Sequence, residues 1–203
     1  MRLLTLITLS CIIGLSSCQE NKNKQTENPN TVSTLTETPK DSSTSIQTDS
    51  TLIVRENFNR INAIKNWDRI DSAEIHESTE GGIAKYYTKN NVLELIKARH
   101  YGESGYTFQD IYLKDGKLSF VFEERFDYNT HIIDPKFDMD KTKKAGEVRY
   151  YYMNDKLFNI IATDKENEKF LKEYKDTDKN LKDVFNKLIK IKENNFDPTG
   201  ISD

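Results

Sequence analysis

Ionisable and aromatic residues gather around two glycine-rich segments, "STEGG" and "RHYGESG", in the middle of the chain. His100 could act as a general base with Glu80 or Glu103 orienting its ring, because imidazole titrates near neutral pH and a neighbouring carboxylate fixes its tautomer. Neither segment has the nucleophile elbow of a hydrolase. Two alternatives stay open: a hydrolase-like site, and a solvated rim at which His100 and Arg99 pair with carboxylates.

Metal and thiol chemistry are not expected. The three histidines, His76, His100 and His131, lie far apart in the chain and form no local pair of ligands. The acidic stretches "DPKFDMDKT" and "DTDKN" lack the glycine and the closing glutamate of an EF-hand loop. No cysteine follows Cys18, so the rest of the chain has neither a disulfide nor a thiolate ligand. The sequence therefore predicts no metal site and no cofactor.

One ten-residue pattern occurs three times and indicates how these residues are positioned. "YTKNNVLELI", "YLKDGKLSFV" and "YYMNDKLFNI" begin at Tyr87, Tyr112 and Tyr151. Their fourth and fifth residues are Asn-Asn, Asp-Gly and Asn-Asp, pairs that tolerate the positive φ of a type I′ turn. Each stretch therefore predicts the tip of a β-hairpin. We expect strands at 83–88, 92–101, 106–114, 117–126, 147–153 and 157–163, and a further one near 73–77.

The turns also predict which residues lie together, since a two-residue turn fixes the register of a hairpin. The first turn places Gly81 opposite His100 and Glu80 opposite Tyr101. Both glycine-rich segments then lie at the end of the sheet away from the turns, where the end of the fourth strand joins them. The candidate binding residues are Glu80, Arg99, His100, Tyr101, Glu103, Glu124 and Arg125.

Alternation along the fourth strand assigns its two faces. The side that we expect to be core carries Leu118, Phe120, Phe122 and Phe126. The other side carries Ser119, Val121, Glu123 and Arg125. Tyrosine, glutamate and arginine also occupy the second side of the fifth strand, so this face is expected to be half-wet. Such a face suits either recognition of a partner or ordinary cross-strand pairing.

Two helices are expected to flank the strands. Apolar residues recur at helical spacing after Ser50, a plausible N-cap: Val54, Phe58, Ile61, Ile64 and Trp67. A second, amphipathic helix near the C-terminus carries Leu181, Val184, Phe185, Leu188 and Ile191 on one face. The predicted class is α+β: an antiparallel meander of six or seven strands built from successive hairpins, with the N-terminal and C-terminal helices covering one face.

The first eighteen residues, "MRLLTLITLSCIIGLSSC", resemble a bacterial lipoprotein signal ending in a lipobox. Arg2 gives a positive start, and the apolar residues 3–15 are too few to span a bilayer. The resemblance implies that residues 1–17 are a signal peptide and that Cys18 becomes the lipidated N-terminus. Residues 18–49 are polar and predict a disordered tether with a reach of roughly 30 Å. A single domain is expected over 50–203.

The segments "STEGG", "RHYGESG" and "LSFVFE" resemble a pattern in uncharacterised exported lipoproteins of Bacteroidetes-type bacteria. The resemblance covers about residues 66–163 and assigns neither an activity nor site residues. Gln19 after the lipidated cysteine implies, by analogy, an outer-membrane address. The following "QENKNK" lacks the acidic run of surface-export signals, which favours the periplasmic side.

Together these features predict a lipid-anchored protein of the cell envelope, attached to the membrane through Cys18. We expect a binding, assembly or inhibitor-type module that presents an antiparallel sheet to a protein, peptide or envelope polymer. The long insertion 127–146 is the expected place of a partner contact. The alternative is a hydrolase-like enzyme using His100 with Glu80 or Glu103. Nucleic acid is not expected as a partner, because 30 Lys and Arg are matched by 33 Asp and Glu.

Overall fold

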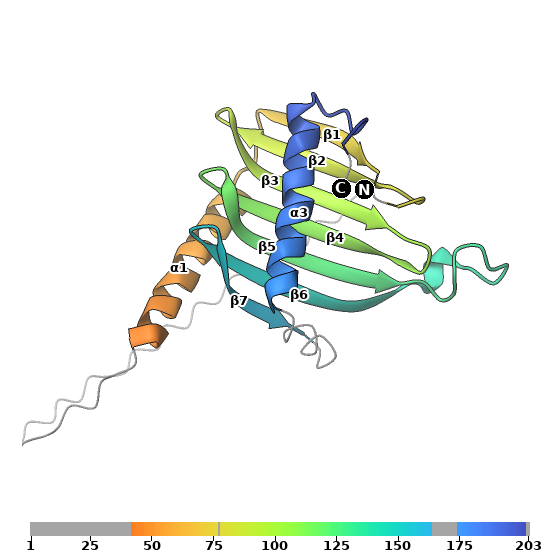
Figure 1. Ribbon diagram of the computed structural model, residues 1–203, viewed down its shortest axis with the longest axis horizontal. Helices are drawn as coiled ribbons and strands as arrows, with labels where there is room; N and C mark the ends of the chain where they lie inside the picture. The colour runs from red at the N-terminus through yellow and green to blue at the C-terminus, as the bar shows by residue number, and fades with distance from the viewer. Residues whose placement is uncertain (1–41, 77, 164–173, 202–203) are drawn as a thin grey trace, which may run out of the picture. The chain divides into compact units, whose positions relative to one another are not determined.

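The chain forms one seven-stranded antiparallel sheet and two α-helices in the computed structural model, which describes residues 42–76, 78–163 and 174–201. The strands lie in the sheet in chain order, so the topology is a meander (Figure 1). The strands are β1 Arg69–Ile75, β2 Gly82–Lys89, β3 Val92–Tyr101, β4 Gly105–Lys114, β5 Lys117–Asp127, β6 Lys143–Met153 and β7 Lys156–Ala162. The helices are α1 Ser42–Asn62, the short 3-10 helix η1 Met139–Lys141, and α3 Tyr174–Glu193. The predicted α+β class, with an antiparallel meander and two flanking helices, is confirmed.

The expected signal peptide at 1–17, the lipidated Cys18 and the tether up to residue 41 lie outside the described residues. α1 begins at Ser42, before the helix start and domain boundary that we expected near residue 50. The segment 42–49 is polar, but a helix whose later turns are buried can extend through polar residues. α1 ends at Asn62, so Trp67 lies beyond the helix, where its ring meets the ring of Tyr87 edge-on at 5.4 Å.

All three repeated stretches form hairpin tips with the same backbone conformation. The two central residues of every turn have positive φ, as a type I′ turn requires: Asn90 50° and Asn91 60°, Asp115 53° and Gly116 75°, Asn154 50° and Asp155 63°. In every hairpin one residue of the second strand is left out of the pairing, forming a β-bulge at the eighth position of the stretch: Glu94, Ser119 and Phe158. The predicted turns are confirmed; the bulges had not been predicted.

The bulges change both the register and the faces that the sequence predicted. Gly82 lies opposite His100, so the expected pairing of Gly81 with His100 was wrong by one residue. Leu118 and Phe120, which we expected on one side, belong to cores on opposite faces of the sheet. A bulge adds one residue to one strand, so the alternation of side chains continues beyond it in the opposite phase.

One face of the sheet, which we call the α3 face, packs against α3. The predicted apolar stripe of this helix provides the contact, with four buried residues: Leu181, Phe185, Leu188 and Ile191. The hydroxyl of Tyr86 donates a hydrogen bond of 3.0 Å to the carbonyl of Leu188 in this interface. Val121, which we expected on a half-wet face, is 1% exposed in this core. In Figure 1 α3 crosses in front of the strands.

The opposite face, the α1 face, packs against α1 at the end of the sheet that carries the hairpin turns (Figure 1). Val54 and Ile61, each 1% exposed, contact a second apolar cluster, which includes Leu95, Tyr112, Phe120 and Tyr151. The side chain of Arg60 binds the carboxylate of the bulge residue Glu94 through two hydrogen bonds, of 2.8 and 2.6 Å. The expectation that both helices cover one face was wrong, because the strands bury apolar residues on both of their sides.

Candidate functional site

α1 covers only the turn end of its face, and no helix of the described chain covers the remainder. We call this remainder the open face. Strands β1 and β7 contribute Glu74 and Ile161 at its edges. The central strands β2–β6 contribute Lys85, Lys97, Arg99, Tyr101, Tyr106, Phe108, Asp110, Phe122, Glu124, Phe126, Lys144, Glu147 and Arg149. Most are neither fully buried nor fully exposed, so rings and charged groups are both accessible there.

The residues predicted as a binding site reach one end of the sheet, as expected, but they do not form one site. The open face carries Arg99, Tyr101 and Glu124, and the α3 face carries His100 and Arg125. The connecting segments carry Glu80 and Glu103. Adjacent residues of a strand point to opposite faces, so Arg99 and His100 cannot act on the same ligand from one side.

The hydrolase alternative loses one of its two carboxylates in this geometry. Glu103, one of the two carboxylates expected to orient His100, instead pairs with His131, with 2.7 Å between Oε2 and Nε2. His131 belongs to the loop between β5 and β6, and the backbone N–H groups of Tyr128 and Ile132 in the same loop donate to the carbonyls of Ser104 and Glu103. The turn between β3 and β4 is therefore engaged in holding this loop.

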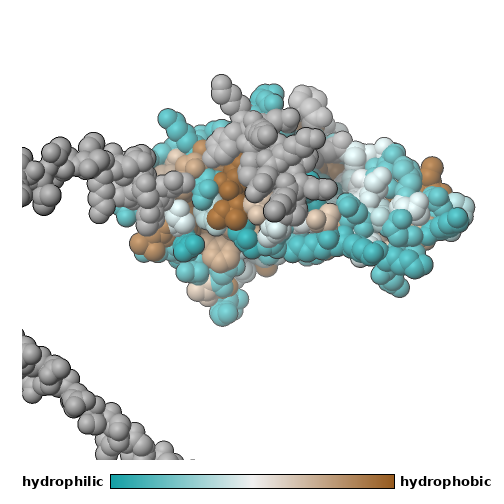
Figure 2. All heavy atoms as spheres, turned by 90° about the horizontal axis from the view of Figure 1, so that it is seen from below, coloured by the Kyte–Doolittle hydropathy of each residue, from teal (hydrophilic) through white to brown (hydrophobic). Residues whose placement is uncertain are grey.

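The insertion predicted at 127–146 is shorter than expected, because β5 continues to Asp127 and β6 begins at Lys143. The remaining loop, residues 128–142, carries η1. Two apolar side chains of the loop are exposed: Ile133 at 83% and Met139 at 52%. Figure 2 shows the loop end of the molecule as mostly hydrophilic, with a hydrophobic spot at its tip. A partner contact at this loop stays a prediction.

Five aromatic rings form a cluster on and beside the open face, which we call the aromatic platform: Tyr101, Tyr106, Phe108, Phe126 and Tyr128. The ring of Tyr106 stacks on Phe108 and on Phe126, with centroids 4.8 and 4.7 Å apart. The guanidinium of Arg99, which is exposed, lies 4.5 Å from the centroid of Phe108. Burial first, and then the nearby Tyr106, Tyr101 and Glu80, raise the pKa of Tyr128, which keeps this phenol protonated.

A close approach of two strands supports the platform. A Cβ added to Gly105 would lie 2.1 Å from the carbonyl oxygen of Phe126, which is closer than any side chain permits. Gly105 pairs with Asp127, and the next pair along the ladder is Tyr106 with Phe126. Glycine at position 105 therefore lets β4 and β5 come close enough for these two rings to stack.

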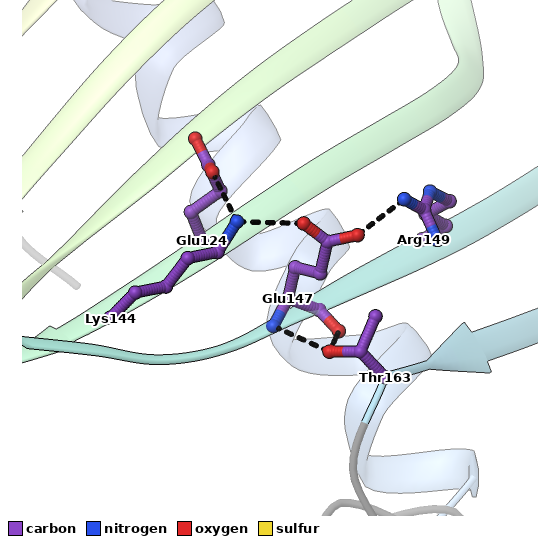
Figure 3. Close-up of polar contacts among 5 residues, drawn as sticks. All are labelled: Glu124, Lys144, Glu147, Arg149 and Thr163. Atoms are coloured by element: carbon purple, nitrogen blue, oxygen red, sulfur yellow. Dashed lines mark hydrogen bonds and ion pairs between the residues drawn. The ribbon is translucent and has the colours of Figure 1, made fainter.

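A network of charged side chains borders the platform (Figure 3). The Nζ of Lys144 lies 2.7 Å from Oε1 of Glu124 and 2.7 Å from Oε2 of Glu147. Arg149 binds the other oxygen of Glu147, and Thr163 bonds to the backbone of Glu147. The bonds to Glu124 and Glu147 raise the pKa of Lys144, and the bond from Lys144 is the main cause that lowers the pKa of Glu147. The network keeps these groups charged and fixes their positions.

A groove of about 260 Å³ runs along the flank of α1 and opens onto the same face. It is lined by Val54, Arg55, Phe58, Asn59, Phe120, Arg149 and Tyr151. Arg149 belongs to both the groove and the charged network, and its guanidinium lies 5.5 Å from the centroid of Phe122. Arginine and tyrosine on this side of β6 were predicted from the sequence. Their contact with α1 was not, because residue spacing does not report contacts between distant segments.

The open face and its groove are richer in positive charge than the whole chain. Six cations lie there, Arg55, Lys85, Lys97, Arg99, Lys144 and Arg149, against four carboxylates, Glu74, Asp110, Glu124 and Glu147. The chain as a whole has a net charge of −3. This face therefore complements an acidic surface.

Metal sites and membrane-spanning helices are both absent from residues 42–76, 78–163 and 174–201. No group of three or more His, Cys, Asp or Glu side chains in these ranges is arranged to hold a metal ion. No helix in the same ranges is long and apolar enough to cross a membrane. Asp138 and Asp134, in one of the acidic stretches, accept hydrogen bonds from the backbone N–H groups of Asp140 and Lys136.

Comparison with known proteins gives no indication of function, so the open face is the main evidence for it. The chain matches no protein-family model, no curated protein and no solved structure. Function is therefore inferred from the rings, charges and groove described above.

Proposed function

We propose that this protein is a non-catalytic binding module of the cell envelope, and that its open face holds an acidic segment of a partner protein. The observation that carries the proposal is a sheet face on which stacked rings and arginines stay accessible. In this proposal Cys18 carries the lipid that attaches the module to the outer membrane, on the periplasmic side. The tether before α1 would give the module freedom to reach its partner.

The residue types on the open face support binding to a protein. Aromatic residues and arginine are enriched where proteins meet, and they dominate the energy of such interfaces. Here the rings stand on paired strands and stack on one another, so little side-chain freedom is left to lose on binding. Arg99 and Arg149 each lie over a ring, which holds the guanidinium in place, and the guanidinium of Arg149 also binds Glu147.

Charge supports an acidic partner. The six cations outnumber the four carboxylates, and Arg55 and Arg149 stand in one groove that is wide enough for a side chain of the partner. Opposite charges across an interface steer association and select partners, and the effect weakens as salt screens it.

Fluorescence anisotropy with a short labelled peptide tests the proposal. The probe alternates Glu and Asp with Leu and Tyr, and the control peptide has Gln and Asn at the acidic positions. We expect the acidic peptide to bind more tightly, with an affinity that falls as salt rises. Replacing Arg99 and Arg149 by alanine should weaken binding by about tenfold or more, as truncation of interface arginines does. The matched control, alanine at Lys156 and Lys190, removes the same charge from exposed positions elsewhere.

Three results would contradict the proposal. Equal affinity for the two peptides would remove the role of charge. If the arginine variant and the lysine control bound the acidic peptide equally well, the open face would not be the binding site. Tighter binding of polygalacturonate than of the acidic peptide would make the partner a glycan rather than a protein.

Lipid attachment is tested separately, by feeding cells a clickable palmitate analogue. The full chain should take up label, and Cys18→Ser should not. Cys11→Ser is the control and should keep the label, because the signal peptide that contains it is removed. Label that persists in Cys18→Ser would refute the anchor.

A further inference from the structure

The two edge strands of the sheet, β1 and β7, differ in how they are protected from pairing with another chain (Figure 1). β1 carries three charged side chains, Arg69, Asp71 and Glu74, and the first two form an ion pair of 2.6 Å. β7 carries a single charge, Lys156, at its first position, and continues with the uncharged sequence "LFNIIA". Charged side chains are a common means by which an exposed edge avoids a further strand. β7 is therefore the edge that is open to one.

The free side of β7 presents backbone groups for a further strand. The N–H of Thr163 donates to the carbonyl of Glu147, in step with the pairing of Ala162 with Val148. Alternate residues of an antiparallel ladder direct their N–H and C=O groups to opposite sides, so Ile160 and Ala162 direct theirs away from β6. Within the described part of the chain, no strand pairs with this side of β7.

An exposed isoleucine lies between these two residues. Ile161 is 42% exposed and lies opposite Arg149, at the border of the open face. Packing its side chain against another apolar side chain removes that surface from water, which is favourable. A strand added to β7 would therefore gain backbone hydrogen bonds and an apolar contact together.

We propose that β7 pairs with β7 of a second copy of this chain, antiparallel and about a two-fold axis at Ile161. In this register the two Ile161 side chains lie opposite each other, and Ile160 of each copy lies opposite Ala162 of the other. The outward N–H and C=O groups of the two copies then bond to one another. Asn159 lies opposite Thr163, so an amide meets a hydroxyl and no like charges meet.

The sequence of β7 favours a second copy and this register. A two-fold interface brings each residue type against its own surroundings, so a charged strand would repel its copy, whereas the uncharged residues 157–162 do not. A two-fold axis at Ile160 would bring the bulge residue Phe158 opposite Ala162, where the ladder is irregular. An axis at Ile161 leaves the bulge outside the new pairing.

The dimer would form one continuous sheet with both open faces on the same side, because residues directly opposite each other in a sheet point to the same face. A partner with two acidic segments would then bind both copies, and such linked binding raises the apparent affinity. This consequence rests on the proposed function, whereas the dimer itself does not.

Disulfide cross-linking of the full chain in detergent tests the register, in a Cys11→Ser, Cys18→Ser background that has no other thiol. Ile161→Cys should link two chains rapidly, because directly opposite residues of this kind lie within reach of a disulfide. Asn159→Cys, on the same face of β7, should not, because the two copies of this residue would lie about 14 Å apart along the strands. Ile70→Cys, at an exposed isoleucine of β1, is the control for chance collision.

Sedimentation equilibrium in a density-matched detergent tests the dimer without a cross-link. The unsubstituted chain should sediment as a dimer at sub-millimolar concentration. Ile161→Lys should be monomeric, because two ammonium groups would lie directly opposite each other. Ile70→Lys is the matched control and should stay dimeric, and circular dichroism shows whether both variants fold.

Three results would overturn the inference: a monomeric unsubstituted chain, equal dimerisation of Ile161→Lys and Ile70→Lys, or cross-linking through Asn159→Cys or Ile70→Cys as fast as through Ile161→Cys. Binding of the acidic peptide is measured separately, so failure of the dimer and failure of the proposed function are distinguishable.

Discussion

Replacing Asn57 by alanine should destabilise the fold by about 2 kcal/mol, because it leaves a buried carbonyl without its donor. Asn57 is 6% exposed, and its Nδ2 donates to the carbonyl of Leu113 at 2.9 Å. A buried polar group that loses its partner costs about 1–3 kcal/mol. The two bonds from Nε and Nη2 of Arg60 to Oδ1 of Asn57 add little, because Arg60 is half exposed and keeps its two bonds to Glu94.

Urea unfolding followed by tryptophan fluorescence and by far-UV circular dichroism measures this loss. With a slope of about 2 kcal/mol per molar urea, the midpoint should fall by about 1 M. Trp67, the only tryptophan, packs in the core between α1 and the sheet, so its fluorescence reports on that interface. Asn59→Ala is the control, because Asn59 is exposed on the same helix, and it should shift the midpoint by no more than about a quarter of this amount.

Equal midpoints for the two variants would refute the role of the buried hydrogen bond. A second result would refute the expectation that α1 and the sheet unfold together. If fluorescence changed at lower urea than circular dichroism, α1 would leave the sheet before the sheet unfolds. The two probes should instead coincide, because α1 shares one apolar core with β3–β6.

Two further predictions concern the open face. Gly105→Ala should destabilise the fold by about 3 kcal/mol or more in the same urea assay, because its Cβ would lie 2.1 Å from the carbonyl oxygen of Phe126. Gly102→Ala is the control and should cost far less, because its Cβ would meet its nearest atom at 3.5 Å. The stability that Glu147 contributes is present above its unfolded-state pKa near 4.5, and it is lost as pH falls through its lower folded-state pKa. Glu147→Gln should therefore make the acid limb of a profile of stability against pH shallower. An unchanged acid limb would contradict this prediction.

The turns and α3 could be predicted from the sequence because their signals are local. Asn and Gly at turn centres tolerate positive φ, and the stripe around Leu188 has a clear helical period. The bulges could not be predicted, because the residues that form them, Glu94, Ser119 and Phe158, share neither size nor charge. One missed residue per hairpin was enough to place apolar side chains on the wrong faces.

The candidate site was predicted only in part. Arg99, Tyr101 and Glu124 were correctly brought to one end of the sheet, since hairpin counting is accurate to about one residue. That counting could not tell which face a helix covers, so His100 was grouped with residues on the other side. Arg55 and Arg149 come from segments far apart in the chain, and only the packing of α1 on β6 brings them into one groove.

The strict neighbour-to-neighbour order of the strands has a consequence for how the molecule folds. Each strand meets the one made just before it, so the sheet can assemble by closing short loops, which cost little chain entropy. Pairing between neighbouring strands keeps contacts closer in sequence than pairing between distant strands would, and lower contact order goes with faster folding. The bond from Tyr86 to Leu188 spans 102 residues, so the docking of α3 closes a far longer loop than any hairpin and costs more chain entropy. α3 follows all seven strands in the chain, so it docks on a surface that the strands before it provide.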